Sequence, residues 1–117
     1  MPVTPLPKPP YYVVTFSSQR REGDNGYAAM ADEMVAMAER QPGYLGHESA
    51  RGADGFGITN SYWTDEAAIR AWKQKVDHLE AQRRGRVEWY VTYAVRVARV
   101  ERAYGFDANL DAAARPH

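Results

Sequence analysis

The stretch TDEAAIRAWKQKVDHLEAQRRG, residues 64–85, decides the fold because it is a helix with both ends marked. At its start, the Thr64 hydroxyl can accept from the first free backbone N–H groups, and two acidic residues follow where the helix dipole is positive. At its end, two arginines precede Gly85, which can adopt the left-handed conformation that stops a helix. Between the ends, four apolar residues recur at spacings of four, four and three and form one stripe: Ala68, Trp72, Val76 and Leu79.

His78 lies beside that apolar stripe. At 100° per residue it shares a ridge with Ala71 and Lys75 on the flank of the helix, where a groove can reach it. An unperturbed histidine titrates near neutral pH, which suits a general base. The pattern is equally consistent with an ordinary hydrogen-bonded helix histidine. His78 is therefore the candidate catalytic residue, with a structural role as the alternative.

Composition narrows the class of protein. A chain of 117 residues is one domain by length, and 15 basic and 15 acidic residues give a formal net charge of zero, which argues against a dedicated nucleic-acid binder. The absence of cysteine excludes disulfides and thiolate chemistry, and the three histidines lack metal-ligand spacing. No apolar run approaches the ~20 residues that span a bilayer. We expect a cytoplasmic protein with no metal and no membrane partner.

The other segments alternate between strand and helix patterns. β-branched and aromatic residues, or strict alternation, indicate strands, and an unbroken apolar face that includes Met34 indicates a second helix. In chain order the sequence predicts a strand over residues 11–17, a helix over 24–40, strands over 44–51 and 56–63 joined by a hairpin loop, and, after the helix described above, a strand over 89–102.

This order, β-α-β-β-α-β, is typical of a ferredoxin-like α+β domain, in which two helices cover one face of a four-stranded antiparallel sheet. We expect that domain over residues 11–106, a proline-rich arm over 1–10 that is disordered or laid across a partner, and a flexible tail over 107–117. Both faces of the last strand carry apolar residues, so the uncovered sheet face predicts a homodimer in which two sheets pack together.

Four segments carry a resemblance to a known family. Together with the first strand they cover most of the chain, and their combination of motifs is similar to the antibiotic biosynthesis monooxygenase superfamily, whose members are dimeric α+β barrels. The segments are QPGYLGHES at 41–49, ITNSYW at 58–63, AWKQKVDHLEAQRRGRVEWY at 71–90 and RVARVERAYGF at 96–106.

The resemblance implies a small-molecule pocket between sheet and helices. Some members oxygenate anthrones or quinols with molecular oxygen and no metal or flavin, which needs a base and a dry cavity. We expect His78 as that base and Asn60 as the amide that holds the developing oxyanion. We expect six residues to line the pocket: Met34, Tyr62, Trp63, Trp72, Trp89 and Tyr90.

Two alternatives stay open. A non-catalytic dimeric module that binds a small molecule has the same fold, and a packed core explains each aromatic residue as well as a pocket does. Haem degradation in this superfamily uses an Asn on the first strand and a Trp and His well separated on the second helix. This chain has no Asn over residues 11–17, and Trp72 and His78 are only six residues apart, so haem is the less favoured ligand.

Overall fold

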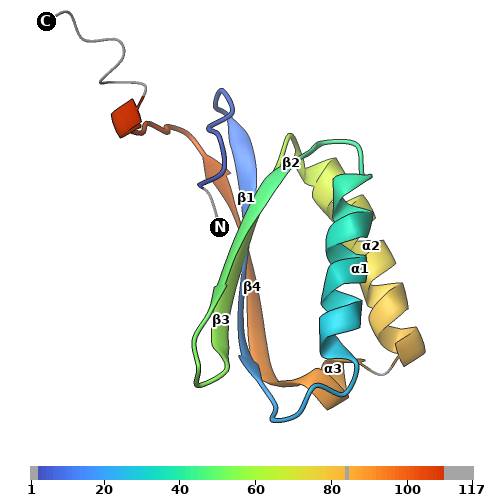
Figure 1. The fold of residues 1–117 in the computed structure, drawn as a ribbon. Helices are drawn as coiled ribbons and strands as arrows, with labels where there is room; N and C mark the ends of the chain where they lie inside the picture. Colours follow the sequence, from blue (N-terminus) through green and yellow to red (C-terminus); the bar gives the residue numbers. More distant parts are fainter. Residues whose placement is uncertain (1–2, 84, 110–117) are drawn as a thin grey trace, which may run out of the picture.

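The computed structural model describes residues 3–83 and 85–109, apart from the side chains of 81–86, and its architecture is the predicted α+β fold (Figure 1). Four antiparallel strands lie in the order β2-β3-β1-β4, and the helices cover one face of the sheet (Figure 1). The elements are β1 (Tyr11–Arg20), α1 (Tyr27–Glu39), β2 (Tyr44–Arg51), β3 (Phe56–Trp63), α2 (Glu66–Arg83), α3 (Gly85–Trp89) and β4 (Tyr90–Val100).

Several boundaries differ from the predicted ones; α1 and β4, for example, are shorter than the predicted 24–40 and 89–102. β1 continues to Arg20 because its last residues pair with both neighbouring strands. The residue that caps α2 is Asp65, not Thr64, since its Oδ1 accepts from the backbone N–H of Ala68 at 2.8 Å. Gly85 opens the short helix α3, and Trp89 closes α3 instead of starting the last strand.

The two faces of the sheet carry different residues, as the predicted alternation of β3 requires. Trp63 is 0% exposed and packs with Ala38 of α1 and Ile69 of α2, so its side of β3 faces the helices. Because side chains alternate along a strand, Tyr62 and Asn60 point to the other face. We call these the helix-facing face and the outer face.

The core between sheet and helices is divided into two clusters of buried residues. One cluster, at the C-terminal end of β3, is built around Trp63, and we call it the upper cluster. The other, near the N-terminal end of α1, is built around Met30, which is 1% exposed, and we call it the lower cluster. The lower cluster also contains Trp89, which explains why this residue leaves the strand: its ring is buried and its Nε1 donates to the carbonyl of Asn25 at 2.9 Å.

The proline-rich arm lies against its own sheet. The Thr4 backbone N–H donates to Oε2 of Glu48, and the Thr4 hydroxyl donates to the carbonyl of His47, both at 3.0 Å. Gly46, at φ 149°, makes room for this contact, because a Cβ there would lie 2.7 Å from Cγ2 of Thr4. In the structure the arm thus contacts its own chain at Thr4.

Candidate functional site

Small and polar side chains occupy the helix-facing face of β2 and β3 between Trp63 and Gly57. A sheet face packed on helices is ordinarily apolar, because burial of that face drives the packing. Here the register places Ser61 and Thr59 of β3 on the helix-facing face, opposite His47 and Ser49 of β2. The Ser49 and Thr59 hydroxyls are 2.8 Å apart and hydrogen-bond to each other. This floor offers polar groups where a core would offer methyl groups.

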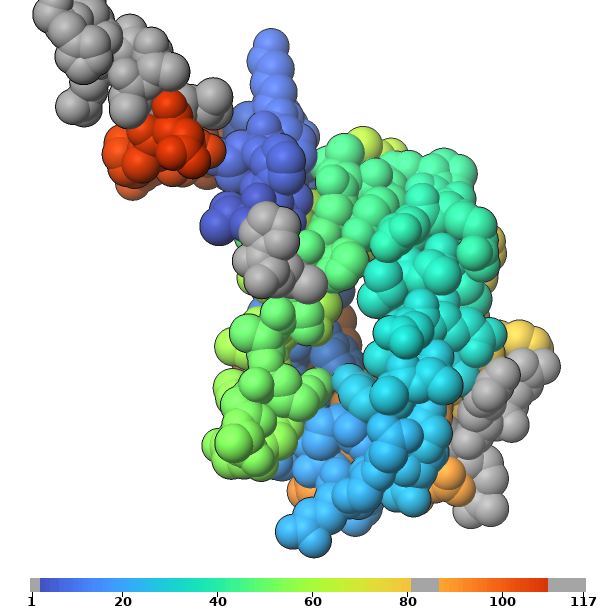
Figure 2. All heavy atoms as spheres, viewed as in Figure 1, coloured from blue at the N-terminus to red at the C-terminus, as the bar shows by residue number. Residues whose placement is uncertain are grey.

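A hollow accompanies these short side chains. Figure 2 shows it between β2 and α1, and the two core clusters lie toward either end of it. We call this space the chamber, and we call the helix-facing residues of the two neighbouring strands, His47, Ser49, Thr59 and Ser61, the polar floor. The upper end of the chamber is closed by the aromatic residues around Trp63.

A tyrosine–histidine pair stands at the upper end of the chamber floor. Tyr44 Oη and His47 Nδ1 are 2.5 Å apart, and the Tyr44 ring packs edge-on against Trp63. A β-bulge between Tyr44 and Gly46 brings both partners to the helix-facing face. Burial raises the pKa of Tyr44, and the nearby Glu39 adds to the rise, so Tyr44 keeps its hydroxyl proton at neutral pH.

Trp72 has the one buried side-chain polar atom without a partner in the described part of the chain. Its ring lies 5.7 Å from that of Trp63, at the upper end of the chamber, and its Nε1 donates to no protein group. The indole of Trp63, in contrast, donates to Oγ of Ser61 at 2.9 Å. A buried donor left unpaired destabilises a fold by about 1–3 kcal/mol, which is why such groups are often found at ligand sites.

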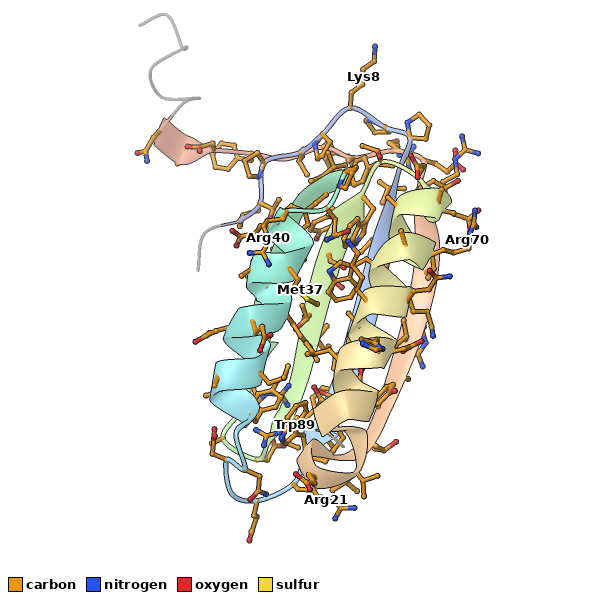
Figure 3. The ribbon with its side chains drawn as sticks, turned by 90° about the vertical axis from the view of Figure 1, so that its right-hand side faces the viewer. Lys8, Arg21, Met37, Arg40, Arg70 and Trp89 are labelled. Carbon is orange, nitrogen blue, oxygen red and sulfur yellow. The ribbon has the colours of Figure 1, made fainter. Side chains whose placement is uncertain are left out.

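His78 lies outside the chamber, on a shallow groove between the two long helices. The groove has a volume of about 420 Å³, and Figure 3 shows Met37 between α1 and α2. Lys75 spans the same gap and donates from Nζ to Oε1 of Gln41 at 2.9 Å. A groove does reach the predicted base, but His78 itself is solvent-exposed. The lining residues are Met37, Ala71, Gln74, Lys75, His78 and Leu79.

Asn60 and Tyr62 lie on the outer face, where each is held by a neighbouring side chain. Asn60 Oδ1 accepts from the Thr15 hydroxyl at 2.8 Å, and the Tyr62 hydroxyl donates to Oε1 of Glu48 at 2.5 Å. The sheet therefore separates Asn60 from His78. Within one chain the two cannot act on one substrate atom, and the predicted cavity bounded by both is not formed.

On the outer face, the hydrogen bond between Tyr62 and Glu48 shifts the pKa values of both groups. Burial and the hydrogen bond to Glu48 raise the pKa of Tyr62 to about 12. The same hydrogen bond, together with the one from the Thr4 backbone, lowers the pKa of Glu48. Each group thus holds the other in the protonation state it has at neutral pH, which is a structural role.

The remaining predicted pocket residues lie on the helix-facing side, at the lower cluster. Tyr90 and Trp89 are buried there, and Met34 packs against them. Burial, followed by the interaction with Tyr27, raises the pKa of Tyr90 and keeps its hydroxyl protonated. Of the six predicted pocket residues, five lie between sheet and helices and Tyr62 does not.

His47 is the residue that sequence reasoning missed. Simple alternation places Tyr44 and His47 on opposite faces, because they are three positions apart. Only the bulge at Leu45 puts them side by side, and a bulge leaves no reliable mark in a single sequence. The sequence signal that could have pointed to this region lies on β3, the strand paired with β2. There the small polar residues Thr59 and Ser61 share a face with Trp63.

Comparison with known proteins gives the family. The antibiotic biosynthesis monooxygenase family matches residues 10–84, and the chain belongs to this family. It is 52% identical over 103 residues to the uncharacterized protein YqjZ of Bacillus subtilis (strain 168), a match that covers 88% of this chain and 90% of YqjZ.

Solved structures share the fold at low sequence identity. SnoaB, a cofactor-independent oxygenase from Streptomyces nogalater, matches with a TM-score of 0.64 and 17% identity over 81% of this chain and 97% of SnoaB. Rv0793 from Mycobacterium tuberculosis matches with a TM-score of 0.58 and 19% identity over 84% of this chain and 98% of Rv0793. These likenesses show the fold.

Two classes of feature are absent from the described residues. Across residues 3–83 and 85–109, no group of three or more His, Asp or Glu side chains is placed to hold a metal ion. None of the helices described there is long and apolar enough to cross a membrane.

Proposed function

We propose that this protein is a cofactor-independent monooxygenase that binds a small aromatic substrate in the chamber and oxygenates it with O2. The observation that carries the proposal is the polar floor of short side chains on β2 and β3, together with the hollow between β2 and α1 (Figure 2). Membership of the monooxygenase family and the fold shared with SnoaB support it. Phenols, quinols and anthrones are the substrate class, because they release a proton to give an electron-rich anion that reacts with O2.

We assign the role of base to His47. When Nδ1–H donates to the Tyr44 oxygen, Nε2 has a free lone pair and can take a proton from the substrate. Tyr44 fixes the ring, and its oxygen stabilises the imidazolium that forms. His78 is the second candidate, but its exposure to solvent gives it no dry surroundings in which a carbanion would survive.

For an anthrone-type methylene the reaction balances without a cofactor. His47 removes one proton from the CH2 group, O2 adds to the carbanion, and return of the proton gives a hydroperoxide. Loss of water then leaves a carbonyl. One oxygen atom of O2 enters the product and the other leaves as water, and the substrate carbon supplies all four electrons.

The outer face is proposed to pair with a second copy of the chain. Phe56 and Ile58 of β3 are 46% and 41% exposed there, and the small residues Ser17 of β1 and Ala50 of β2 lie on either side of Ile58. Two such faces packed by a two-fold axis would cover both patches. The arm of residues 3–10 lies at one end of this face, so its deletion is expected to weaken association, as measured by analytical ultracentrifugation.

The test is oxygen uptake with an anthrone or hydroquinone panel, recorded with an oxygen electrode. His47→Gln is expected to lower kcat by at least about 100-fold, since general-base catalysis contributes roughly 10²–10⁴-fold. His78→Gln is the matched control, a histidine on the far side of the helices, and is expected to keep kcat within about twofold. One O2 should be consumed for each substrate molecule.

Three results would contradict this account. Full activity of His47→Gln would remove the assigned base. Loss of activity in His78→Gln alone would move the chemistry to the helix groove. Tight binding of the aromatic panel with no oxygen uptake would make the protein the non-catalytic binding module. Unfolding curves of both variants, matched to the native protein, establish that any loss is not a loss of fold.

A further inference from the structure

Two guanidinium groups flank the ring of Tyr27 at the lower end of the chamber. Cζ of Arg20 lies 3.6 Å from the ring centroid, and Cζ of Arg51 lies 5.8 Å from it. Arg51 closes β2 and reaches across the helix-facing face to buried Ser18 of β1 and to α1. The polar floor of the chamber therefore ends in a positively charged rim.

Both arginines are held by neutral groups. Arg51 donates to the Gly55 carbonyl at 2.5 Å, to Oγ of Ser18 at 3.0 Å and, weakly, to the Tyr27 hydroxyl at 3.3 Å and the Ser18 carbonyl at 3.5 Å. Arg20 donates to the backbone carbonyls of Trp89, Gly23 and Asp24. No carboxylate of the described residues lies within 4.0 Å of either arginine in an ion pair.

The guanidinium of Arg51 is also fixed in position. It lies directly over Gly57 of β3, where a Cβ would come within 2.7 Å of its Cζ. A group held in place before the ligand arrives loses little conformational entropy on binding. The two longest of its contacts can be exchanged for stronger ones to an anion, because charge-assisted bonds to a planar carboxylate suit the guanidinium fork.

The neighbouring hydroxyls do not supply the missing negative charge. Ser18 is 2% exposed and neutral, and Tyr90 keeps its proton because burial raises its pKa. The carboxylate of Glu80 acts on Tyr90 but forms no ion pair with Arg51 or Arg20. The rim therefore combines a fixed cation with neutral hydroxyl groups, and among the described residues neither Arg51 nor Arg20 forms an ion pair.

We propose that Arg51, supported by Ser18 and Tyr27, is an anion-binding subsite that takes the carboxylate of an aromatic ligand whose rings fill the chamber. The assignment rests on the proposed function in one respect, since it takes an aromatic occupant of the chamber as given. It makes Arg51 a specificity-determining residue: acids are selected over neutral aromatics of the same size.

The test compares two probes of nearly the same shape, the anion 1-naphthoate and the neutral 1-naphthamide, by titration calorimetry. Arg51→Met is expected to weaken naphthoate binding by about 10- to 100-fold, the range of a charge-assisted hydrogen bond, and to leave naphthamide within about twofold. Arg96→Met is the matched control, because Arg96 lies on the outer face of β4 opposite Thr15 and is expected to change neither affinity.

An equal loss of both affinities in Arg51→Met would show a structural residue and overturn the subsite, as would native naphthoate binding no tighter than naphthamide binding. If Arg51→Met does not fold, Arg51→Lys decides the matter, because it keeps the charge without the fork and is expected to lose part of the preference for naphthoate. A preserved preference in Arg51→Lys would contradict the assigned fork. Charge selectivity without oxygen uptake would keep the subsite and reject the oxygenase.

Discussion

The helix-facing and outer faces of one sheet both carry polar and aromatic residues, yet among the described residues the groups without a hydrogen-bond or ion-pair partner discussed above lie on the helix-facing face. On the outer face Asn60 is bonded to Thr15, and Tyr62 is bonded to Glu48. On the helix-facing face the Trp72 indole has no partner and Arg51 has no carboxylate. Residue type alone pointed to Asn60 as a site residue. The hydrogen-bond partners show instead that the unpaired indole N–H and the arginine without an ion pair lie on the helix-facing face of the described sheet.

The largest expected difference between the faces is in stability. Trp63→Ala removes a fully buried ring that joins β3 to both helices and is expected to cost about 3–5 kcal/mol of unfolding free energy. Phe56→Ala, on the outer face of the same strand and 46% exposed in the single chain, is expected to cost the monomer at high dilution less than about 1 kcal/mol. Urea unfolding measures both. Equal losses would mean that the outer face is as closely packed as the helix-facing one.

A smaller effect is expected where the arm crosses the sheet. Gly46→Ala places a side chain at φ 149° and 2.7 Å from Thr4, and is expected to cost on the order of 1–2 kcal/mol. Gly105→Ala is the control, because its Cβ would meet only the flexible end of Leu6 at 3.2 Å. Hydrogen exchange at the Thr4 amide should become faster in Gly46→Ala alone. Unchanged protection would mean that the arm is not held by this contact.

The smallest expected effect is a pH dependence of the unfolding free energy that comes from Tyr62 on the outer face. A tyrosine whose pKa is raised on folding stabilises the fold fully below its unfolded value of 10.0, and this contribution is lost as pH rises toward the folded value of about 12. The stability advantage of the native protein over Tyr62→Phe, about 1 kcal/mol or less for a partly exposed pair, should therefore shrink between pH 10 and 12. A constant difference across that window would contradict the Glu48 contact.

Much of the fold was predictable because its signals are local. The bounds of β2 and β3 and the alternation that separates Trp63 from Tyr62 follow from a period of two, and the stripe of α2 from a period of 3.6. The site was less predictable. The bond between Thr15 and Asn60 joins residues 45 positions apart and depends on strand register, and the Tyr44–His47 pair depends on a bulge.

The location of the ligand is the central claim, and one spectrum tests it. In a 1H–15N correlation spectrum, the indole N–H of Trp72 reports on the helix-facing side and the side-chain amide of Asn60 on the outer face. On titration with 1-naphthoate, the Trp72 signal is expected to shift most and the Asn60 signal to stay in place. If the Asn60 signal shifts and the indole signals of Trp72 and Trp63 do not, the ligand binds on the outer face, and the account is contradicted.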